Sequence, residues 1–306
     1  MEYKVTVLMS AYNGARYIKE QIQSILDQKD VTVSLVIRDD GSTDETPLIL
    51  DQIAEQNANV SLVKSGDKNM GPGESFMSLL YGSFEEGDSY YAFADQDDVW
   101  LDDKLISGIS MIEDIEGPAL YSSNQFLYQD GVNKGPRFDF IPDMTVAGHI
   151  TRNLPSGCTY VFNNALAKEV CGSVHAPKDV LTTRLHDSWL MLVALCIGKA
   201  VYDPTPHILY RIHDNNTVGV KKMGPVQDLR LKYKRLTDKR YSRYRSKTCK
   251  ALLDSFPGIS GRTRELLCEV AYYRNDRDMR KALRKDTEFI SKAGKHIPLK
   301  ILFGLI

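Results

Sequence analysis

The sequence predicts an α/β fold with a mainly parallel central sheet, followed by a C-terminal helical segment. Strand-like apolar runs alternate with stretches whose apolar residues recur every three or four positions. Strands that alternate with helices in this way are typical of a parallel sheet. The charge balance also changes along the chain. We therefore expect two parts, residues 1–220 and residues 221–306.

The alternation is clearest in the first hundred residues. We expect strands at 4–10, 31–37, 60–63 and 90–94, with helices at 18–26, from about 43 to 56, and at 74–84. Further along, we expect a helix from 103 to 115, a strand at 119–122, an irregular stretch at 125–155, a buried helix at 189–197, and short strands at 201–203 and 207–212. Helical runs are also expected at 226–254 and 262–293.

Composition excludes several classes of protein. The chain has 306 residues, of which 42% are hydrophobic and 26% charged, as in an ordinary soluble globular protein. It contains no apolar run long enough to span a membrane, and its N-terminus has no signal-peptide pattern. The five cysteines are scattered, which argues against a disulfide framework or a zinc site and favours a reducing cytoplasm.

The net charge of −1 conceals an asymmetry between the two parts. Residues 221–306 hold 23 Lys and Arg against 9 Asp and Glu, a balance of +14, whereas residues 1–220 have a balance of −15. A basic segment can face an anionic membrane surface, and the apolar end at 297–306 could enter its interface or pack on a second subunit of a homodimer. The alternative is a solvated face that covers the first part. Nucleic acid is a weaker option, because no nucleic-acid motif accompanies the charge.

An acidic stretch follows the expected strand at 90–94. Asp95, Asp97 and Asp98 come directly after this apolar run. Three carboxylates at the end of a buried strand repel one another unless a cation neutralises them. Carboxylate oxygens suit Mg²⁺ or Mn²⁺, which also bind substrate phosphates. The alternative is an acidic turn exposed to solvent.

Polar loops at 10–14, 39–44 and 95–98 follow three of the expected strands. Ligands of parallel sheets bind at the carboxyl ends of the strands, so we expect these loops to meet around one crevice. The chain has neither Gly-x-Gly-x-x-Gly nor Gly-x-x-x-x-Gly-Lys. A dinucleotide dehydrogenase or a P-loop enzyme is therefore unfavoured, and a metal on the acidic stretch would supply the counter-charge for nucleotide phosphates.

Three segments in this order resemble glycosyltransferase family 2. They are Val5-Thr-Val-Leu-Met-Ser-Ala-Tyr-Asn-Gly, Ile37-Arg-Asp-Asp-Gly-Ser-Thr-Asp and Ala94-Asp-Gln-Asp-Asp-Val-Trp. Within the family, the chain is most similar to bacterial rhamnosyltransferases that build cell-wall and capsular polysaccharides. The resemblance covers roughly the first 220 residues. It implies a GT-A fold, an inverting mechanism and a nucleotide-sugar donor.

The resemblance also implies a donor site and a metal site. The donor site would comprise Ser10, Ala11, Tyr12, Asn13, Asp39, Asp40, Asp95, Gln96 and Arg211. Asp39 would bind the pyrimidine edge and Asp40 would lie near the ribose or the metal; the alternative for both is an Asx-type turn before a helix. Asp95, Asp97 and His213 would hold Mg²⁺ or Mn²⁺, whereas the role of Asp98 stays open. Residues 215–224 could form a lid over the donor.

A second chemical stretch, Leu185-His-Asp-Ser-Trp-Leu190, begins the expected buried helix. Inverting transfer needs a base to take the proton of the acceptor hydroxyl, and by the resemblance this base is Asp187. The alternative is that Asp187 only caps the helix. The family often has Trp where this chain has Ser188. Residues Gly157, Cys158, His186 and Trp189 would border the acceptor; for the first two, the alternative is a tight turn into a core strand.

These expectations combine into a hypothesis of function. The chain would be a cytoplasmic inverting rhamnosyltransferase at the inner face of the plasma membrane. Its donor would be dTDP-β-L-rhamnose and its acceptor a lipid-diphosphate-linked saccharide. One alternative is the same chemistry with UDP-glucose or UDP-galactose. Another is an inactive nucleotide-binding scaffold of polysaccharide assembly.

Overall fold

The computed structural model describes residues 2–63, 69–87, 89–213, 243–294 and 297–302. The strands are β1 (Tyr3–Ala11), β2 (Val31–Asp39), β3 (Val60–Val63), β4 (Tyr90–Ala94), β5 (Val99–Trp100), β6 (Ala119–Gln129), β7 (Val132–Pro136), β8 (Val161–Asn163) and β9 (Lys199–Arg211). The helices are α1 (Ile18–Leu26), α2 (Thr46–Gln56), α3 (Pro72–Ser83), α4 (Lys104–Ser110), α5 (Val146–Thr151), α6 (Asn164–Gly172), α7 (Lys178–Ile197), α9 (Tyr244–Ser255), α10 (Gly261–Tyr272), α11 (Arg277–Leu283), α12 (Thr287–Ala293) and α13 (Ile297–Leu302).

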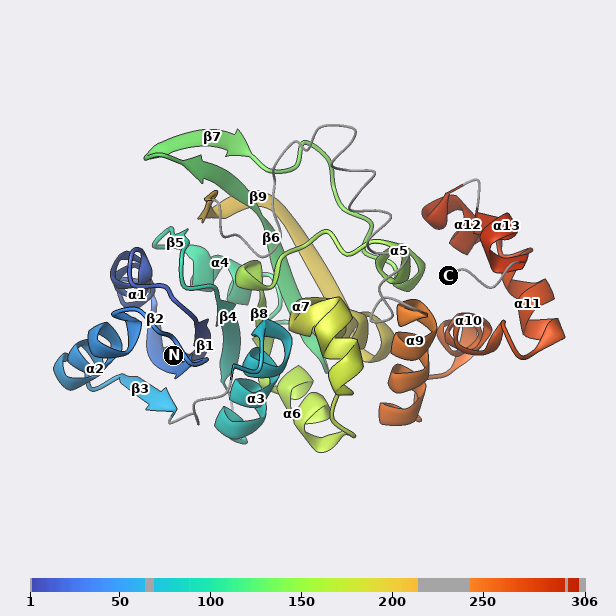
Figure 1. Ribbon diagram of the computed structural model, residues 1–306, viewed down its shortest axis with the longest axis horizontal. Helices are drawn as coiled ribbons and strands as arrows, with labels where there is room; N and C mark the ends of the chain where they lie inside the picture. Colours follow the sequence, from blue (N-terminus) through green and yellow to red (C-terminus); the bar gives the residue numbers. More distant parts are fainter. Residues whose placement is uncertain (1, 64–68, 88, 214–242, 295–296, 303–306) are drawn as a thin grey trace.

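One nine-stranded sheet runs through the centre of the molecule (Figure 1). Its strands follow the order β3-β2-β1-β4-β8-β6-β9-β5, with β7 paired to β6. The pairs β1–β2, β1–β4, β2–β3 and β6–β9 are parallel, whereas β8 is antiparallel to both neighbours. The short pairs β5–β9 and β6–β7 are also antiparallel. Most paired residues belong to the parallel pairs, and the predicted α/β fold with a mainly parallel sheet is confirmed.

Strand β4 shows why the acidic stretch lies where it does. Tyr91 and Phe93 pack into the apolar cluster that also contains α3, α6 and α7, whereas Ala92 and Ala94 pack into the cluster with α1, α2 and α4. Successive side chains of a strand point to opposite faces, so this strand is covered on both sides. The acidic residues 95, 97 and 98 come only after β4 ends, where the chain leaves the region that helices cover on both faces.

Three expectations for the middle of the chain are wrong. The helix expected to reach residue 115 ends at Ser110. The stretch at 125–155, expected to be irregular, contains the end of β6, all of β7 and helix α5. Its polar side chains hid the strand: Asn124 and Gln125 are buried but hydrogen-bonded to Phe138 and Arg137. The two late strands are one strand, β9, which pairs with β6 through a register irregularity.

Helix α7 is broken at Leu185, whose φ of 62° and ψ of 171° are not helical. The left-handed region is costly for a residue with a Cβ, about 1–3 kcal/mol, so the surrounding packing must hold it. The second part of α7 therefore begins at His186. Trp189 to Ala194 are all buried, as the apolar pattern predicted.

The C-terminal helices α9–α13 share a core with the part of the chain that precedes them. They gather at one end of the molecule, beside α5 and α7 (Figure 1). Their apolar residues, including Leu252 and Leu267, belong to the same cluster as Trp189 of α7. Arg245 of α9 donates hydrogen bonds to the carbonyl oxygens of Ile150 and Thr151. Helices α9–α13 therefore pack against α5 and α7, which belong to the helices beside the sheet.

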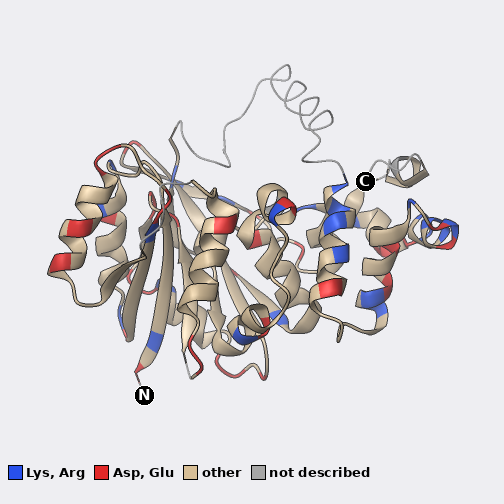
Figure 2. Cartoon of the chain, turned by 60° about the horizontal axis from the view of Figure 1, so that its bottom comes forward, with Lys and Arg blue, Asp and Glu red and all other residues tan. Residues whose placement is uncertain are grey.

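The helical runs expected near the C-terminus are divided differently in the structure. The run expected at 262–293 is three helices, α10, α11 and α12. The run expected at 226–254 appears as α9, and its residues 226–242 lie outside the described part, as do the lid expected at 215–224 and the boundary at 220. Lys and Arg are frequent on these helices, whereas α1 and α2 at the opposite end are marked by Asp and Glu (Figure 2). No helix in the described ranges is long and apolar enough to cross a membrane.

We expect the shared core to give one unfolding transition. Leu267→Ala removes a fully buried side chain of α10, so it should lower the free energy of unfolding by about 2–5 kcal/mol. Thermal and denaturant unfolding of the full chain measure this. Leu299→Ala is the matched control, because this side chain is 59% exposed on α13 and its loss should cost less than about 0.5 kcal/mol. Two separate transitions, with only one moved by Leu267→Ala, would contradict a shared core.

Candidate active site

The loops that follow β1, β2 and β4 meet at the carboxyl ends of these strands. The Gln96 side chain joins the first loop to the third: Nε2 donates to the carbonyl oxygen of Tyr12 at 2.9 Å, and Oε1 accepts from the N–H of Tyr12 at 2.8 Å. The N–H of Asn13 donates to Ser42 Oγ at 2.8 Å, and Asn13 Oδ1 accepts from the N–H of Thr43 at 2.8 Å. The predicted convergence is confirmed, and the loops border a cleft of about 1180 Å³.

The second loop brings Asp40, and not Asp39, to the cleft. Asp40 lines the cleft and is 2% exposed; its carboxylate accepts from the N–H groups of Met70 and Gly71 and from Arg38 Nη2. The Asp39 carboxylate accepts instead from the N–H and Oγ of Ser42, in the turn that leads to α2. These bonds form the Asx-type turn that was the alternative for Asp39, and its contact with a nucleobase stays a prediction. Through its hydrogen bonds to Met70 and Gly71, Asp40 also holds the 69–71 loop at the border of the cleft.

The acidic loop presents two carboxylates to the cleft, Asp95 and Asp97. Asp97 Oδ2 lies 2.6 Å from His213 Nε2, which joins the loop after β4 to the segment after β9. Burial, and then the charges of Asp97 and Asp187, raise the pKa of Asp95 to about 7. The negative charges of these carboxylates thus repel one another, as expected for a site that a cation would neutralise.

Asp98 has a positioning role that the sequence left open. It is fully buried, and Oδ1 accepts from the backbone N–H of Arg211 at 3.1 Å, which anchors the end of β9 to the acidic loop. Burial, and then the charges of Asp97 and Asp95, raise the pKa of Asp98. Trp100 packs beneath the loop, and the buried Lys104 Nζ lies 3.6 Å from the centroid of its ring.

Two overlapping sets of side chains could hold a cation. Among the described residues, ligand atoms of Asp95, Asp98 and Cys158 all lie within 4.8 Å of one another. However, burial first, and then the charges of Asp98 and Asp95, raise the pKa of the Cys158 thiol, and a protonated thiol is a poor ligand for a hard cation.

The predicted set, with Asp97 and His213 beside Asp95, offers the oxygen and imidazole ligands that Mn²⁺ accepts, although its atoms are less tightly grouped. Asp98 Oδ2 is buried and has no hydrogen-bond partner among the described residues. The residues present therefore fit a divalent cation at this edge of the sheet.

Asp187 faces this loop from the second part of α7. It is partly exposed, lines the cleft and accepts from the N–H of Ser188 at 2.6 Å. Gly157 allows it to approach: an added Cβ there would lie 2.9 Å from Asp187 Cβ and 2.7 Å from His186 Nε2. Because the charge of Asp187 contributes to the raised pKa of Asp95, the two carboxylates act on each other within one cleft.

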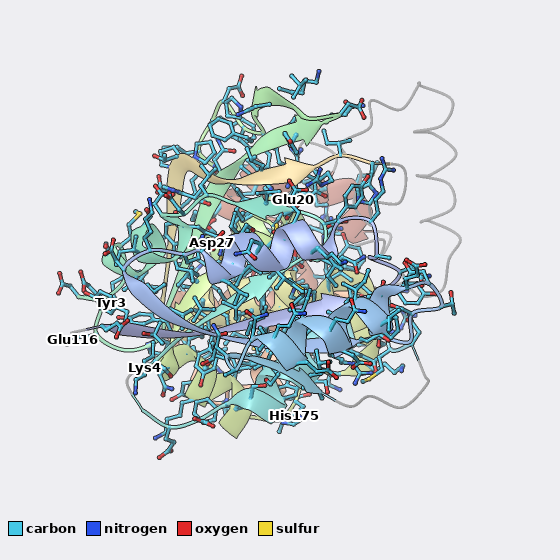
Figure 3. The ribbon with its side chains drawn as sticks, turned by 90° about the vertical axis from the view of Figure 1, so that its left-hand side faces the viewer. Tyr3, Lys4, Glu20, Asp27, Glu116 and His175 are labelled. Atoms are coloured by element: carbon cyan, nitrogen blue, oxygen red, sulfur yellow. The ribbon has the colours of Figure 1, made fainter. Side chains whose placement is uncertain are left out.

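Arg211 is held at the edge of the cleft by several contacts. Its Nε donates to the carbonyl oxygen of Asp97 at 2.8 Å, and Nη2 pairs with Glu20 Oε2 at 2.7 Å. Its guanidinium carbon lies 4.5 Å from the centroid of the Tyr17 ring. Figure 3 shows Glu20 on α1, on the side that faces β9. The positively charged guanidinium of Arg211 is thus fixed in place beside the acidic loop.

Most of the predicted residues line this cleft, and three do not. The lining includes Ser10, Tyr12, Asn13, Asp40, Asp95, Gln96, Asp97, Gly157, Cys158, His186, Asp187, Arg211 and His213. Ala11, Asp39 and Trp189 are not among the lining residues. Ala11 is a fully buried strand residue, and Trp189 is 1% exposed in the core, with its ring 6.4 Å from that of Phe256. Trp189 therefore supports the site from within the core.

Sequence reasoning missed several lining residues. Arg16 and Tyr17 lie two and three residues beyond the predicted first loop, so their position along the chain was a usable signal. Phe76 of α3 and the turn at 129–131 between β6 and β7 also line the cleft. The turn could not be found, because the strand before it was concealed by buried polar side chains.

The family model described as glycosyl transferase family 2 matches residues 6–166, which is more than half of the chain and includes all three loops. The chain belongs to glycosyl transferase family 2.

Two relatives of this family 2 glycosyltransferase have names that include a nucleotide-linked sugar. The dTDP-rhamnosyl transferase RfbG of Shigella flexneri is 32% identical over 248 residues, which cover 79% of this chain and 82% of that protein. The UDP-Glc:alpha-D-GlcNAc-diphosphoundecaprenol beta-1,3-glucosyltransferase WfgD of Escherichia coli is 29% identical over 111 residues, 36% of this chain and 42% of that protein.

Solved structures share the GT-A fold of this glycosyltransferase. The crystal structure of S. aureus TarS 1–349 in complex with UDP-GlcNAc has a TM-score of 0.60 at 14% identity, and the match covers 99% of this chain and 84% of that one. The mannosyltransferase PcManGT from Pyrobaculum calidifontis, in complex with GDP-Man and Mn²⁺, has a TM-score of 0.52 at 18% identity and covers 98% and 78%. Identities this low establish the fold alone.

Proposed function

We propose that this glycosyltransferase moves L-rhamnose from dTDP-β-L-rhamnose to a lipid-diphosphate-linked saccharide in bacterial surface-polysaccharide synthesis. The observation that carries the proposal is the position of Asp187, which faces the acidic loop across one cleft. The identity to the dTDP-rhamnosyl transferase RfbG supports the donor. The likeness to WfgD, whose name contains a diphosphoundecaprenol acceptor, supports the lipid-linked acceptor.

In this proposal, Asp187 is the general base. Its carboxylate takes the proton of the acceptor hydroxyl as that oxygen bonds to the anomeric carbon of the donor. The bond from that carbon to the diphosphate breaks, and the electron pair leaves with the nucleoside diphosphate. Attack opposite the leaving group inverts the anomeric centre, so a β-linked donor gives an α-L-rhamnosyl product. A single base suffices for this step.

The three loops would bind the donor. Ser10, Tyr12, Asn13 and Asp40 border the end of the cleft proposed for the nucleoside. Asp95, Asp97 and His213 would hold Mg²⁺ or Mn²⁺, which when bound neutralises the charge of the leaving diphosphate. Arg211 adds a fixed positive charge beside them.

The acceptor side would be formed by the turn Gly157–Thr159 and the start of the second part of α7. Gly157, Cys158 and His186 line the cleft there. The cleft volume of about 1180 Å³ is larger than is usual for a single small ligand, and it leaves room for a sugar acceptor beside the nucleotide sugar.

We also propose that the protein is cytoplasmic and binds peripherally to the inner face of the plasma membrane. The basic C-terminal helices carry the positive charge that an anionic lipid surface attracts (Figure 2). Leu299 and Leu302 of α13 are exposed there, whereas Ile297 and Ile301 pack into the core. These exposed leucines could equally meet a second subunit, and sedimentation with and without anionic vesicles separates the two roles.

Product analysis tests the donor and the acceptor together. Incubation with dTDP-rhamnose, Mn²⁺ and a lipid-linked saccharide should add one deoxyhexose, and nuclear magnetic resonance should show an α linkage. The likeness to WfgD makes UDP-glucose the second donor to test. Faster transfer from UDP-glucose than from dTDP-rhamnose would replace the proposed donor. Binding of nucleotide sugars without transfer to any acceptor would favour a scaffold.

A further inference from the structure

His186 is a buried side chain without hydrogen bonds. It is 5% exposed, and neither Nδ1 nor Nε2 has a hydrogen-bond partner among the described residues. Buried polar atoms are normally paired, since leaving them unpaired costs free energy. An imidazole with two unpaired nitrogens beside the proposed base therefore calls for a partner that the described part of the chain does not supply.

Aromatic packing holds the ring of His186 in one orientation. The ring stacks on Phe76 of α3, with centroids 4.0 Å apart and an interplanar angle of 25°. Phe93 of β4 meets it edge-on, at 4.9 Å and 89°. The break at Leu185 sets the start of the helix that carries it. A ring fixed on two sides offers its nitrogens in a constant direction.

His186, whose two ring nitrogens are buried, stands in the wall of the cleft. His186, Phe76 and Gly157 all line it. An added Cβ on Gly157 would lie only 2.7 Å from His186 Nε2, so any side chain at this position would clash with this buried, unpaired nitrogen. The same added Cβ would lie 2.9 Å from Asp187 Cβ. The unpaired nitrogen and the proposed base thus both lie beside Gly157.

The chemistry of the ring narrows the choice of partner. Burial lowers the pKa of His186 to about 3, so the imidazole is neutral and has one donor and one acceptor nitrogen. A neutral ring between two phenyl rings has no charge to attract a phosphate. It matches a hydroxyl group, which both donates and accepts.

We propose that His186 binds a hydroxyl of a sugar substrate beside Asp187 and so determines which sugar is accepted. This inference deepens the proposed function and rests on it. The hydroxyl can belong to the acceptor saccharide or to the sugar of the donor, and the experiment distinguishes the two. A sugar that lacks this hydroxyl would leave the imidazole unpaired and be rejected.

The test is His186→Phe, which keeps the aromatic stack and removes the hydrogen bonds. Four quantities are measured: the KM for the acceptor, the Kd for the nucleotide sugar, the Kd for the nucleoside diphosphate alone, and the Tm. We expect about a tenfold rise in the acceptor KM, or about a tenfold rise in the nucleotide-sugar Kd with an unchanged diphosphate Kd. The first result assigns the hydroxyl to the acceptor and the second to the donor. The Tm should stay equal or rise, because an unpaired buried imidazole has been replaced by an apolar ring.

His175→Phe is the matched control. His175 stacks on Tyr81 at 3.7 Å and 2°, and it is not among the residues that line the cleft. It lies at the edge of the molecule opposite Glu20 and β9 (Figure 3). Its replacement should leave all three binding constants within twofold of the wild type.

Unchanged KM and Kd values in His186→Phe would overturn the inference. If that variant does not fold, His186→Gln takes its place, since its amide keeps a donor and an acceptor in a new position. Altered sugar selectivity in this variant supports the inference, and unaltered selectivity overturns it. A wild-type protein that transfers no sugar refutes the proposed function instead, while the comparison of nucleotide sugar with nucleoside diphosphate still reports on His186.

Discussion

Asp187→Asn should lower the kcat of sugar transfer by about 10²–10⁴-fold while the Kd for the nucleotide sugar stays near the wild-type value. The amide keeps the size of the side chain and its hydrogen bond to the N–H of Ser188, but it cannot take a proton. Steady-state transfer assays give the kcat, and calorimetric titration with the nucleotide sugar gives the Kd. The loss belongs to the chemical step, since the donor loops are untouched.

The matched control for this variant lies on the same helix. Asp179 stands in the first part of α7, where its carboxylate pairs with Lys247 Nζ at 2.8 Å on the surface. Asp179→Asn should leave kcat unchanged within about twofold, because exposed ion pairs contribute little. Turnover of Asp187→Asn close to that of the wild type would show that another group is the base. A parallel loss of donor binding would show that the carboxylate serves the donor site.

Asp97→Asn should be the second most damaging replacement, with transfer reduced on the order of 10²–10³-fold. Asp97 contacts His213 and lies between Asp95 and Asp98 in sequence, so its amide would remove one charged ligand from the proposed cation site. The wild-type protein should bind the nucleotide sugar more tightly with Mn²⁺ than with chelator. In the variant, this difference should shrink or vanish, and titration calorimetry measures it.

Asp102→Asn controls for the loss of a nearby negative charge. Its exposed carboxylate pairs with Lys29 at the surface and lies outside the cleft lining. Its replacement should change neither the turnover nor the effect of Mn²⁺ by more than a few-fold. Full activity of the wild type after chelation would refute a metal-dependent transfer. Activity abolished equally in both Asp variants would point to a general effect of charge.

The sequence by itself determined the part of the molecule where local pattern and global fold agree. Strands β1 to β4 and helices α1 to α3 follow apolar periodicities that any mainly parallel sheet requires. The polar loops after these strands had to meet, because parallel strands place their carboxyl ends at one edge. Asp95 and Asp97 could therefore be predicted as members of one site, whereas Asp187 was added to it by the family resemblance, and the structure brings all three to one cleft.

Only the tertiary structure decided which neighbouring side chain does what. Asp39 and Asp40 are adjacent in sequence, yet one serves a turn and the other borders the cleft, because successive side chains point in different directions. Asp98 could be assigned only after its bond to the N–H of Arg211, more than a hundred residues away, was seen. Such long-range pairs leave no periodic trace in the sequence.

The same limit explains why the sequence did not predict the hairpin of β6 and β7 or the packing of the C-terminal helices. Asn124 and Gln125 are polar and buried, so their hydrogen bonds, and not their polarity, reveal the strand. The basic residues of the last helices indicated that one side of these helices is exposed to solvent. They did not indicate the apolar side, which packs into the core that contains Trp189. Charge and motif identify which residues can do chemistry, whereas packing decides which of them face one another.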